Sequence, residues 1–63
     1  MKGYGKKLKE LRGARSQTEI ANAIKVAPSA IAMYESEQRM PRDDVKIKLA
    51  SLFKTTVQYI FYT

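Results

Sequence analysis

Apolar positions between residues 16 and 35 recur at the spacing of two short helices joined by a tight turn. Ile20 and Ile24 lie one helical turn apart, and Ile31 and Tyr34 form a second such pair. Two further residues suit the corner and the crossing of the helices, namely Val26 and the small Ala21. This pattern predicts a helix-turn-helix, with the first helix reaching about Ile24 and the second starting at Pro28.

Three further segments show helical periodicity. Tyr4, Leu8 and Leu11 predict a helix over 2–12, ended by Gly13-Ala14. After Pro41, Asp43 and Asp44 suit the first turn of another helix, because carboxylates favour the positive end of the helix dipole. The apolar side of that helix is expected to contain Val45, Ile47, Leu49, Ala50, Leu52 and Phe53. A last short helix is expected over 57–62, so the chain reads as all-α, five helices in one domain spanning 1–63.

Two segments match the capping box, in which side chains and backbone amides at a helix start exchange hydrogen bonds. Ser16 and Glu19 form the first match, and Thr55 and Gln58 form the second. Lys25 lies at the turn where a left-handed backbone is expected, which costs on the order of 1 kcal/mol for a residue other than glycine.

The composition narrows the possible functions. The 63 residues contain neither cysteine nor histidine, which argues against a disulfide scaffold, a Cys/His metal site and thiol or histidine catalysis. No signal peptide and no apolar run near the roughly 18 residues of a membrane span are evident, so a cytoplasmic protein is expected. We find no convergent carboxylate pair or glycine-rich phosphate loop, and we expect no enzyme, metal or cofactor.

Net charge favours a polyanionic partner. Twelve Lys/Arg against six Asp/Glu give +6, and residues 1–25 hold seven of these cations against two carboxylates, or +5. A solvated charged surface is the alternative explanation for the lysine cluster near the amino end.

The second helix of the helix-turn-helix is a candidate for entry into the DNA major groove. Ala27, Ala30, Ile31 and Tyr34 are expected to face the core. The residues left outside are Pro28, Ser29, Ala32 and Met33. An exposed methionine beside alanine indicates either a groove contact or a surface for a protein partner.

The order and spacing of six fragments make the chain resemble the phage repressor and Cro-type (Xre-like) helix-turn-helix regulators. The resemblance covers residues 4–62 and rests on LKELR at 8–12, SQTEIA at 16–21, VAPSAIAMYE at 26–35, RMP at 39–41, KLA at 48–50 and TTVQYIF at 55–61. It implies a five-helix, lambda-repressor-like domain that binds operator DNA as a symmetric dimer.

The resemblance also implies residue roles. Gln17 would lie against a phosphate and near the start of the recognition helix, while Pro28, Ser29, Ala32 and Met33 would lie at base edges. The remaining candidates for DNA contact are Ser16, Lys25, Ser36, Gln38, Arg39 and Arg42. Val57, Gln58 and Phe61 of the last helix are the candidate dimer contacts.

Three departures from the family pattern affect loop geometry. The connection at residues 13–15 is about two residues shorter than usual, and Lys25 and Glu37 stand where the family usually has glycine.

Arg12 and Glu35 match an ion pair of the family, and helix electrostatics give the pairing independent support. Glu35 ends its helix, where the dipole disfavours an anion, so a nearby cation is expected. Two unrelated surface charges are the alternative.

The sequence therefore predicts a sequence-specific regulator of transcription that binds double-stranded DNA, and a repressor is favoured over an activator. An antitoxin or anti-repressor, acting through a protein partner on the same fold, is the principal alternative. RNA binding is less favoured, since an α-helix fits the major groove of B-DNA.

Overall fold

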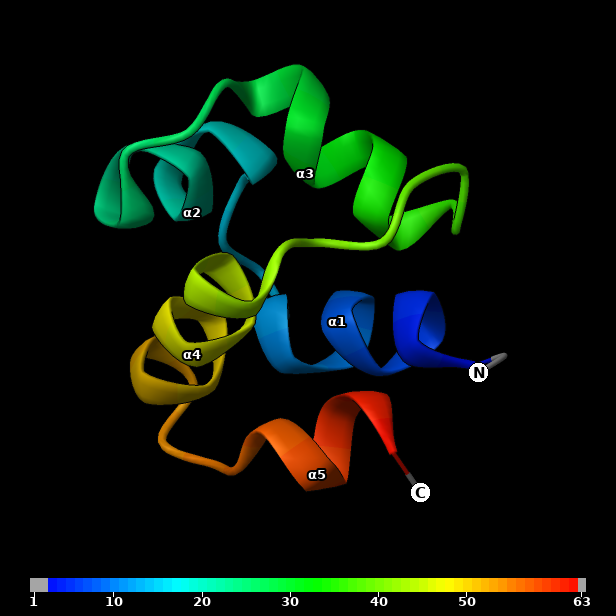
Figure 1. The fold of residues 1–63 in the computed structure, drawn as a ribbon. Coiled ribbons are helices and arrows are strands. Elements are labelled where there is room, and N and C mark those ends of the chain that lie inside the picture. Colours follow the sequence, from blue (N-terminus) through cyan, green and yellow to red (C-terminus); the bar gives the residue numbers. More distant parts are fainter. Residues whose placement is uncertain (1–2, 63) are drawn as a thin grey trace.

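The computed structural model describes residues 3–62, which form helices and loops without strands. The helices are α1 (Tyr4–Arg12), α2 (Gln17–Ile24), α3 (Pro28–Glu35), α4 (Asp43–Leu52) and α5 (Val57–Phe61), as Figure 1 shows. Lys2, where the first helix was expected to begin, lies outside the described residues. The all-α fold with a helix-turn-helix in α2 and α3 is confirmed.

The core is built from the apolar stripes of all five helices. α1 lies between α3 and α5, and α2 packs against both α3 and α4 (Figure 1). The buried apolar residues are Tyr4, Leu8, Ile20, Ala21, Ile24, Ile31, Tyr34, Val45, Leu49, Ala50, Ile60 and Phe61. Ala21 is fully buried, as a close crossing of α2 and α3 requires. Ala27, by contrast, is exposed because it precedes α3 as its N-cap.

The capping box of α2 is present as predicted. The Ser16 hydroxyl accepts a hydrogen bond from the Glu19 amide at 3.0 Å, and the Ser16 amide donates to the Glu19 carboxylate at 3.2 Å. The second predicted box is wrong by one residue, because Thr56 rather than Thr55 is the N-cap of α5. The Thr55 amide instead donates to Ala50 O at 2.9 Å and so closes the end of α4.

Within residues 3–62, three residues other than glycine have a left-handed backbone. Lys25 has φ 60° and ψ 48°, which confirms the expected turn, and its strain is on the order of 1 kcal/mol. Glu37 at φ 62° and Lys54 at φ 56° share this conformation. All three end or follow helices, where a left-handed residue lets the next amides bond the last helical carbonyls.

The short connection between α1 and α2 is closed by Arg15. Its guanidinium donates to Arg12 O at 3.2 Å and to Leu11 O at 2.9 Å, and it lies over the Phe53 ring at 5.3 Å from the centroid. Gly13 supplies the positive φ of 62° that ends α1. The Arg15 side chain therefore adds donors at the carboxyl end of α1, where the Gly13 amide also bonds Lys9 O at 3.1 Å and the Arg15 amide bonds Arg12 O at 3.2 Å.

One prediction for α4 is wrong. Ile47, expected on the apolar side, is 62% exposed, whereas Lys46 is buried. The Lys46 ammonium donates to the Tyr62 hydroxyl at 2.8 Å and lies over the rings of Phe61 and Tyr62. That hydrogen bond is the main cause that raises the pKa of Lys46. The end of α5 thus covers position 46 through a long-range contact. The buried side of α4 includes Lys46 and leaves Ile47 in solvent.

Candidate nucleic-acid interface

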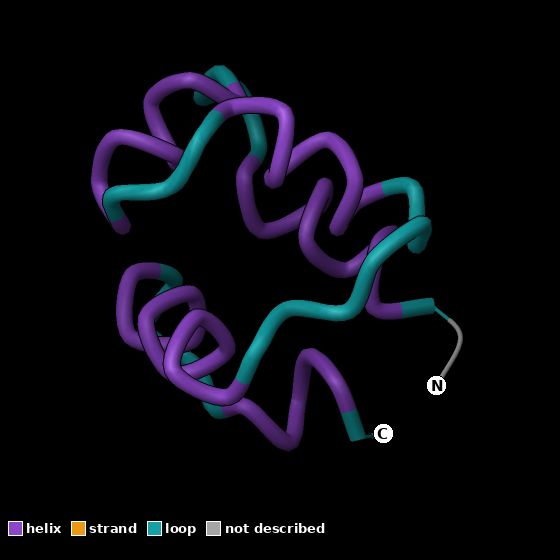
Figure 2. The backbone as a smooth tube through the Cα atoms, turned by 45° about the horizontal axis from the view of Figure 1, so that its top comes forward, coloured by secondary structure: helices purple, strands orange, loops and turns teal. Residues whose placement is uncertain are grey.

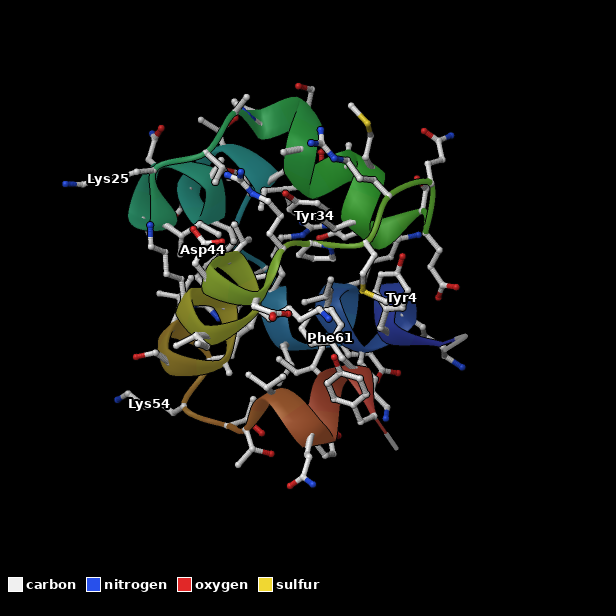
Figure 3. The ribbon with its side chains drawn as sticks, viewed as in Figure 1. Tyr4, Lys25, Tyr34, Asp44, Lys54 and Phe61 are labelled. Carbon is white, nitrogen blue, oxygen red and sulfur yellow. The ribbon has the colours of Figure 1, made fainter. Side chains whose placement is uncertain are left out.

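α3 presents one face to solvent because its other face is locked into the core. Ile31 and Tyr34 are buried, and Figure 3 shows Tyr34 pointing from α3 into the fold. Pro28 and Ser29 are exposed, while Ala32 and Met33 are half-buried rather than fully open. An α-helix with its side chains is about 10–12 Å across. This uncharged outer face is therefore small enough to fit in a DNA major groove, which is about 12 Å wide.

A buried carboxylate fixes α3 against α1 and α2. Arg12 Nε lies 2.7 Å from Glu35 Oε2, and Arg12 Nη2 lies 3.0 Å from Glu35 Oε1, so the predicted ion pair is present and bidentate. The Glu35 side chain is only 2% exposed. Burial on its own would raise the pKa of Glu35, but the hydrogen bonds from Arg12 and Gln17 and the charge of Arg12 outweigh burial and lower it.

Gln17 takes part in the same cluster. Its Nε2 donates to Glu35 Oε1 at 3.0 Å, so the side chain reaches the end of α3 rather than the expected start. Its amide is neither simply solvated nor wholly available to a phosphate. Gln17 therefore connects the first turn of α2 to the last turn of α3, and this hydrogen bond helps to fix the orientation of α3 relative to α2.

The polar residues around α3 fall into two groups. Ser36 ends α3, and its hydroxyl donates to Met33 O at 3.2 Å; Gln38, Arg39 and Arg42 follow on the exposed loop to α4. Figure 2 shows this loop crossing the outside of the molecule. Ser16, also exposed, precedes α2. The loop thus carries two exposed arginines next to the carboxyl end of α3.

Lys25 is separate from these residues. It projects outward from the turn between α2 and α3 (Figure 3). It lines a shallow groove of about 550 Å³ with residues of α4, including Ile47 and Lys48. The structure therefore places Lys25 on the α2/α4 side and does not bring it together with the outer residues of α3.

Several cations of the basic amino-terminal half bond other groups of the protein itself. Arg12 binds Glu35, Arg15 caps α1, and the Lys7 ammonium donates to Tyr59 O at 2.8 Å, on the α5 side. Lys6 and Lys9 are exposed. The positive charge near α3 therefore comes more from Arg39 and Arg42 than the lysine cluster of the sequence indicated.

The expected dimer residues differ in accessibility. Gln58 is exposed and Val57 is half-buried, but Phe61 is 2% exposed and packs 5.5 Å from the Tyr4 ring. Phe61 therefore belongs to the core, which corrects its assignment to a subunit contact. Tyr59 and Tyr62 are about half exposed and present the larger aromatic surface of this segment.

Sequence comparison agrees with the architecture. The helix-turn-helix family (HTH_3) matches residues 8–60, most of the chain. No curated protein and no solved structure matches the chain significantly. No helix within residues 3–62 is long and apolar enough to cross a membrane. The match includes α2, α3 and α4 with parts of α1 and α5, and the chain belongs to the helix-turn-helix family of Xre/Cro-like DNA-binding transcriptional regulators.

Proposed function

We propose that the protein is a cytoplasmic repressor of transcription that binds a pseudo-palindromic operator as a homodimer through α3. The supporting observation is the outer face of α3, which is uncharged, about 12 Å long and followed directly by the exposed Arg39 and Arg42. Phosphate contacts by the arginines would set the position of α3, and its side chains would contact base edges. Bound over a promoter, such a dimer would exclude RNA polymerase.

The size of the domain supports a dimer. The Cα trace extends 26 Å along its longest axis, whereas successive half-sites on one face of B-DNA lie about 34 Å apart. One domain can therefore insert α3 at one half-site only. A two-fold pair of domains would reach two half-sites, and the exposed start of α5 is the proposed contact.

Gln58→Asp tests this assembly. Gln58 is exposed in the first turn of α5, where a carboxylate suits the helix dipole, so the fold should be retained. In the proposed contact the start of α5 lies at the two-fold axis, where a residue meets its own copy, so the two added charges should repel. We expect weaker self-association in sedimentation and loss of cooperativity on a two-half-site duplex. Val57→Asp should act similarly, and full cooperativity in both variants would refute the contact.

The residues of α3 predict apolar readout of bases. Of the outer residues only Ser29 carries a polar side chain, and its hydroxyl can donate or accept. Ala32 and Met33 can instead pack on the C5 methyl of thymine, which the major groove presents at A·T pairs alone. We therefore propose thymines under Ala32 and Met33, with part of the specificity supplied by deformability of uncontacted base pairs.

Uracil substitution in a selected operator tests both DNA binding and the mode of readout. Uracil lacks only the methyl group and keeps every base hydrogen bond of thymine. Affinity should fall by about 0.8 kcal/mol for each well-packed methyl, roughly fourfold. Met33→Ala should abolish the difference at its own position but not under Ala32. Unchanged affinity across a fully substituted half-site would exclude apolar readout, and failure to select any operator would exclude specific binding.

Regulation through a protein partner is a second candidate function. Ile47 is 62% exposed in the groove between α2 and α4, beside Lys25 and Lys48. Such an apolar surface is consistent with an antitoxin or anti-repressor partnership. Absence of duplex DNA binding at low salt would favour this function over the operator-binding one.

A further inference from the structure

The loop between α3 and α4 is held by hydrogen bonds from the start of α1. The Glu37 carboxylate accepts from the Gly3 amide at 2.8 Å and from the Gly5 amide at 3.0 Å, both through Oε2. The Tyr4 hydroxyl donates to Arg39 O at 3.1 Å. Figures 1 and 2 show this loop running beside the first turn of α1.

Glu37 supplies a cap that α1 lacks locally. Gly3 is the N-cap of α1 and has no side chain to bond the free amides of the first turn. A carboxylate 34 residues away takes that role, and the positive end of the helix dipole favours its charge. The Glu37 backbone adopts φ 62°, a conformation that favours glycine, and from there its side chain reaches the start of α1.

Gly5 permits this close approach. A Cβ at Gly5 would collide with the backbone oxygen of Glu35 and lie 2.9 Å from Cγ of Glu37. The first turn of α1 therefore packs directly against the backbone at the end of α3. Only glycine at position 5 leaves room for both contacts.

The direction of the Glu37 side chain matters for DNA binding. Glu37 lies between Ser36 and Gln38, in a loop expected to face phosphates, where a free carboxylate would repel DNA. The cap on α1 directs this carboxylate to the backbone amides of Gly3 and Gly5, while residue 37 itself stays exposed. At the same time it restrains the backbone that carries Arg39.

We propose that Glu37 is a positioning residue for DNA binding, which caps α1 with its carboxylate and thereby holds the loop that presents Arg39 to the phosphate backbone. This proposal rests on the proposed operator-binding function. It assigns the glutamate at a glycine-type position a role that a glycine could not perform.

Glu37→Gly gives the sharpest test, because it removes the carboxylate and also relieves the left-handed strain. A residue that served the turn alone would tolerate glycine, and loss of a negative charge would by itself tighten DNA binding. We expect the opposite sign: binding to a random 24-base-pair duplex should weaken on the order of tenfold. The slope of log affinity against log salt should also become shallower, by about one unit for each Arg39 that no longer reaches its phosphate. Equal or tighter binding would overturn the proposal.

Two controls separate charge from position. Glu10→Gln, at an exposed site on α1, makes a similar change of charge and should leave binding equal or slightly tighter. Glu37→Gln, whose amide oxygen can still accept both hydrogen bonds but carries no charge to favour the helix dipole, should fall between wild type and Glu37→Gly. Circular dichroism should show all three variants folded.

NMR measurements on the free protein test whether Glu37 holds the loop, without any use of DNA. In Glu37→Gly, the ¹⁵N heteronuclear NOE of residues 38–40 should fall, and the Gly5 amide should exchange faster with solvent. Unchanged values would overturn the proposal even if DNA binding changed. If wild type failed to bind DNA, the proposed function would fail, while these values would still show whether Glu37 holds the loop.

Discussion

Arg12→Ala should lower the free energy of unfolding by about 3–5 kcal/mol, because it leaves the buried Glu35 carboxylate without its cation. The Glu35 side chain is 2% exposed, and within residues 3–62 Gln17 is the side-chain donor that would remain to it. Small domains have total stabilities near the lower end of about 5–15 kcal/mol. Most of the stability of this domain would therefore be lost. Urea denaturation followed by circular dichroism measures the change.

Arg42→Ala is the matched control. The Arg42 side chain is 82% exposed and its Nε lies 4.0 Å from Asp44, so this substitution should cost no more than about 1 kcal/mol. The double variant Arg12→Met/Glu35→Met removes both charges and should be more stable than Arg12→Ala. A loss below about 1 kcal/mol for Arg12→Ala would show that the pair contributes little.

The Arg12–Glu35 pair also predicts how the difference in unfolding free energy between wild type and Arg12→Ala depends on pH. The pKa of Glu35 is lowered in the folded protein, so its contribution is fully present above the unfolded pKa of about 4.3 and is lost as pH falls through the folded pKa. Without Arg12, burial would instead raise the pKa of Glu35. The difference in unfolding free energy between wild type and Arg12→Ala should therefore be wide at neutral pH. It should start to close as pH falls through the raised pKa of Glu35 in the variant, and close fully only below the lowered pKa of Glu35 in wild type.

Features set by neighbouring residues were predictable from the sequence. The Ser16–Glu19 capping box, the start of α3 at Pro28 and the left-handed Lys25 each depend on a few consecutive residues. The buried stripe of α2 and α3 followed from helical spacing. The Arg12–Glu35 pair, although long-range, was predicted because the family resemblance pairs these two positions, and because an anion at the end of a helix needs a nearby cation.

Features set by distant packing were not predictable. Thr55 and Gln58 matched the capping box in the sequence, but the Thr55 amide closes the end of α4, and Thr56 is the N-cap of α5. Lys46 is buried because Tyr62 and Phe61 fold over it, which no local pattern indicates. Phe61 faces the core because it packs against Tyr4 of α1, a contact between distant parts of the chain.

The Glu37 contact shows the limit most clearly. A glutamate at a glycine-type position was visible in the sequence and predicted altered loop geometry. Its partners, the amides of Gly3 and Gly5, lie 34 and 32 residues away and carry no side-chain signal. Backbone donors at a helix start leave no trace in a pattern of side chains, so only the structure could identify them.

Binding of the dimer to its operator should weaken about a thousandfold when salt rises from about 50 to about 200 mM, if roughly six phosphates are neutralised. The structure shifts the expected source of this effect. Arg12, Arg15 and Lys7 already bond groups of the protein itself. We therefore expect Arg39 and Arg42 to contribute more to phosphate binding than the lysine-rich start of the chain. Fluorescence anisotropy across a salt series measures the slope of log affinity against log salt.

Arg39→Gln should make that slope shallower by about two units, one for each protomer of the dimer, and weaken operator and random DNA alike. Lys54→Gln removes the same charge at an exposed site on the α5 side, far from α3 in Figure 3, and should leave the slope unchanged. An equal change in both variants would show that net charge alone governs binding. A wild-type affinity independent of salt would exclude the phosphate backbone as the ligand, because displaced counterions must accompany any such contact.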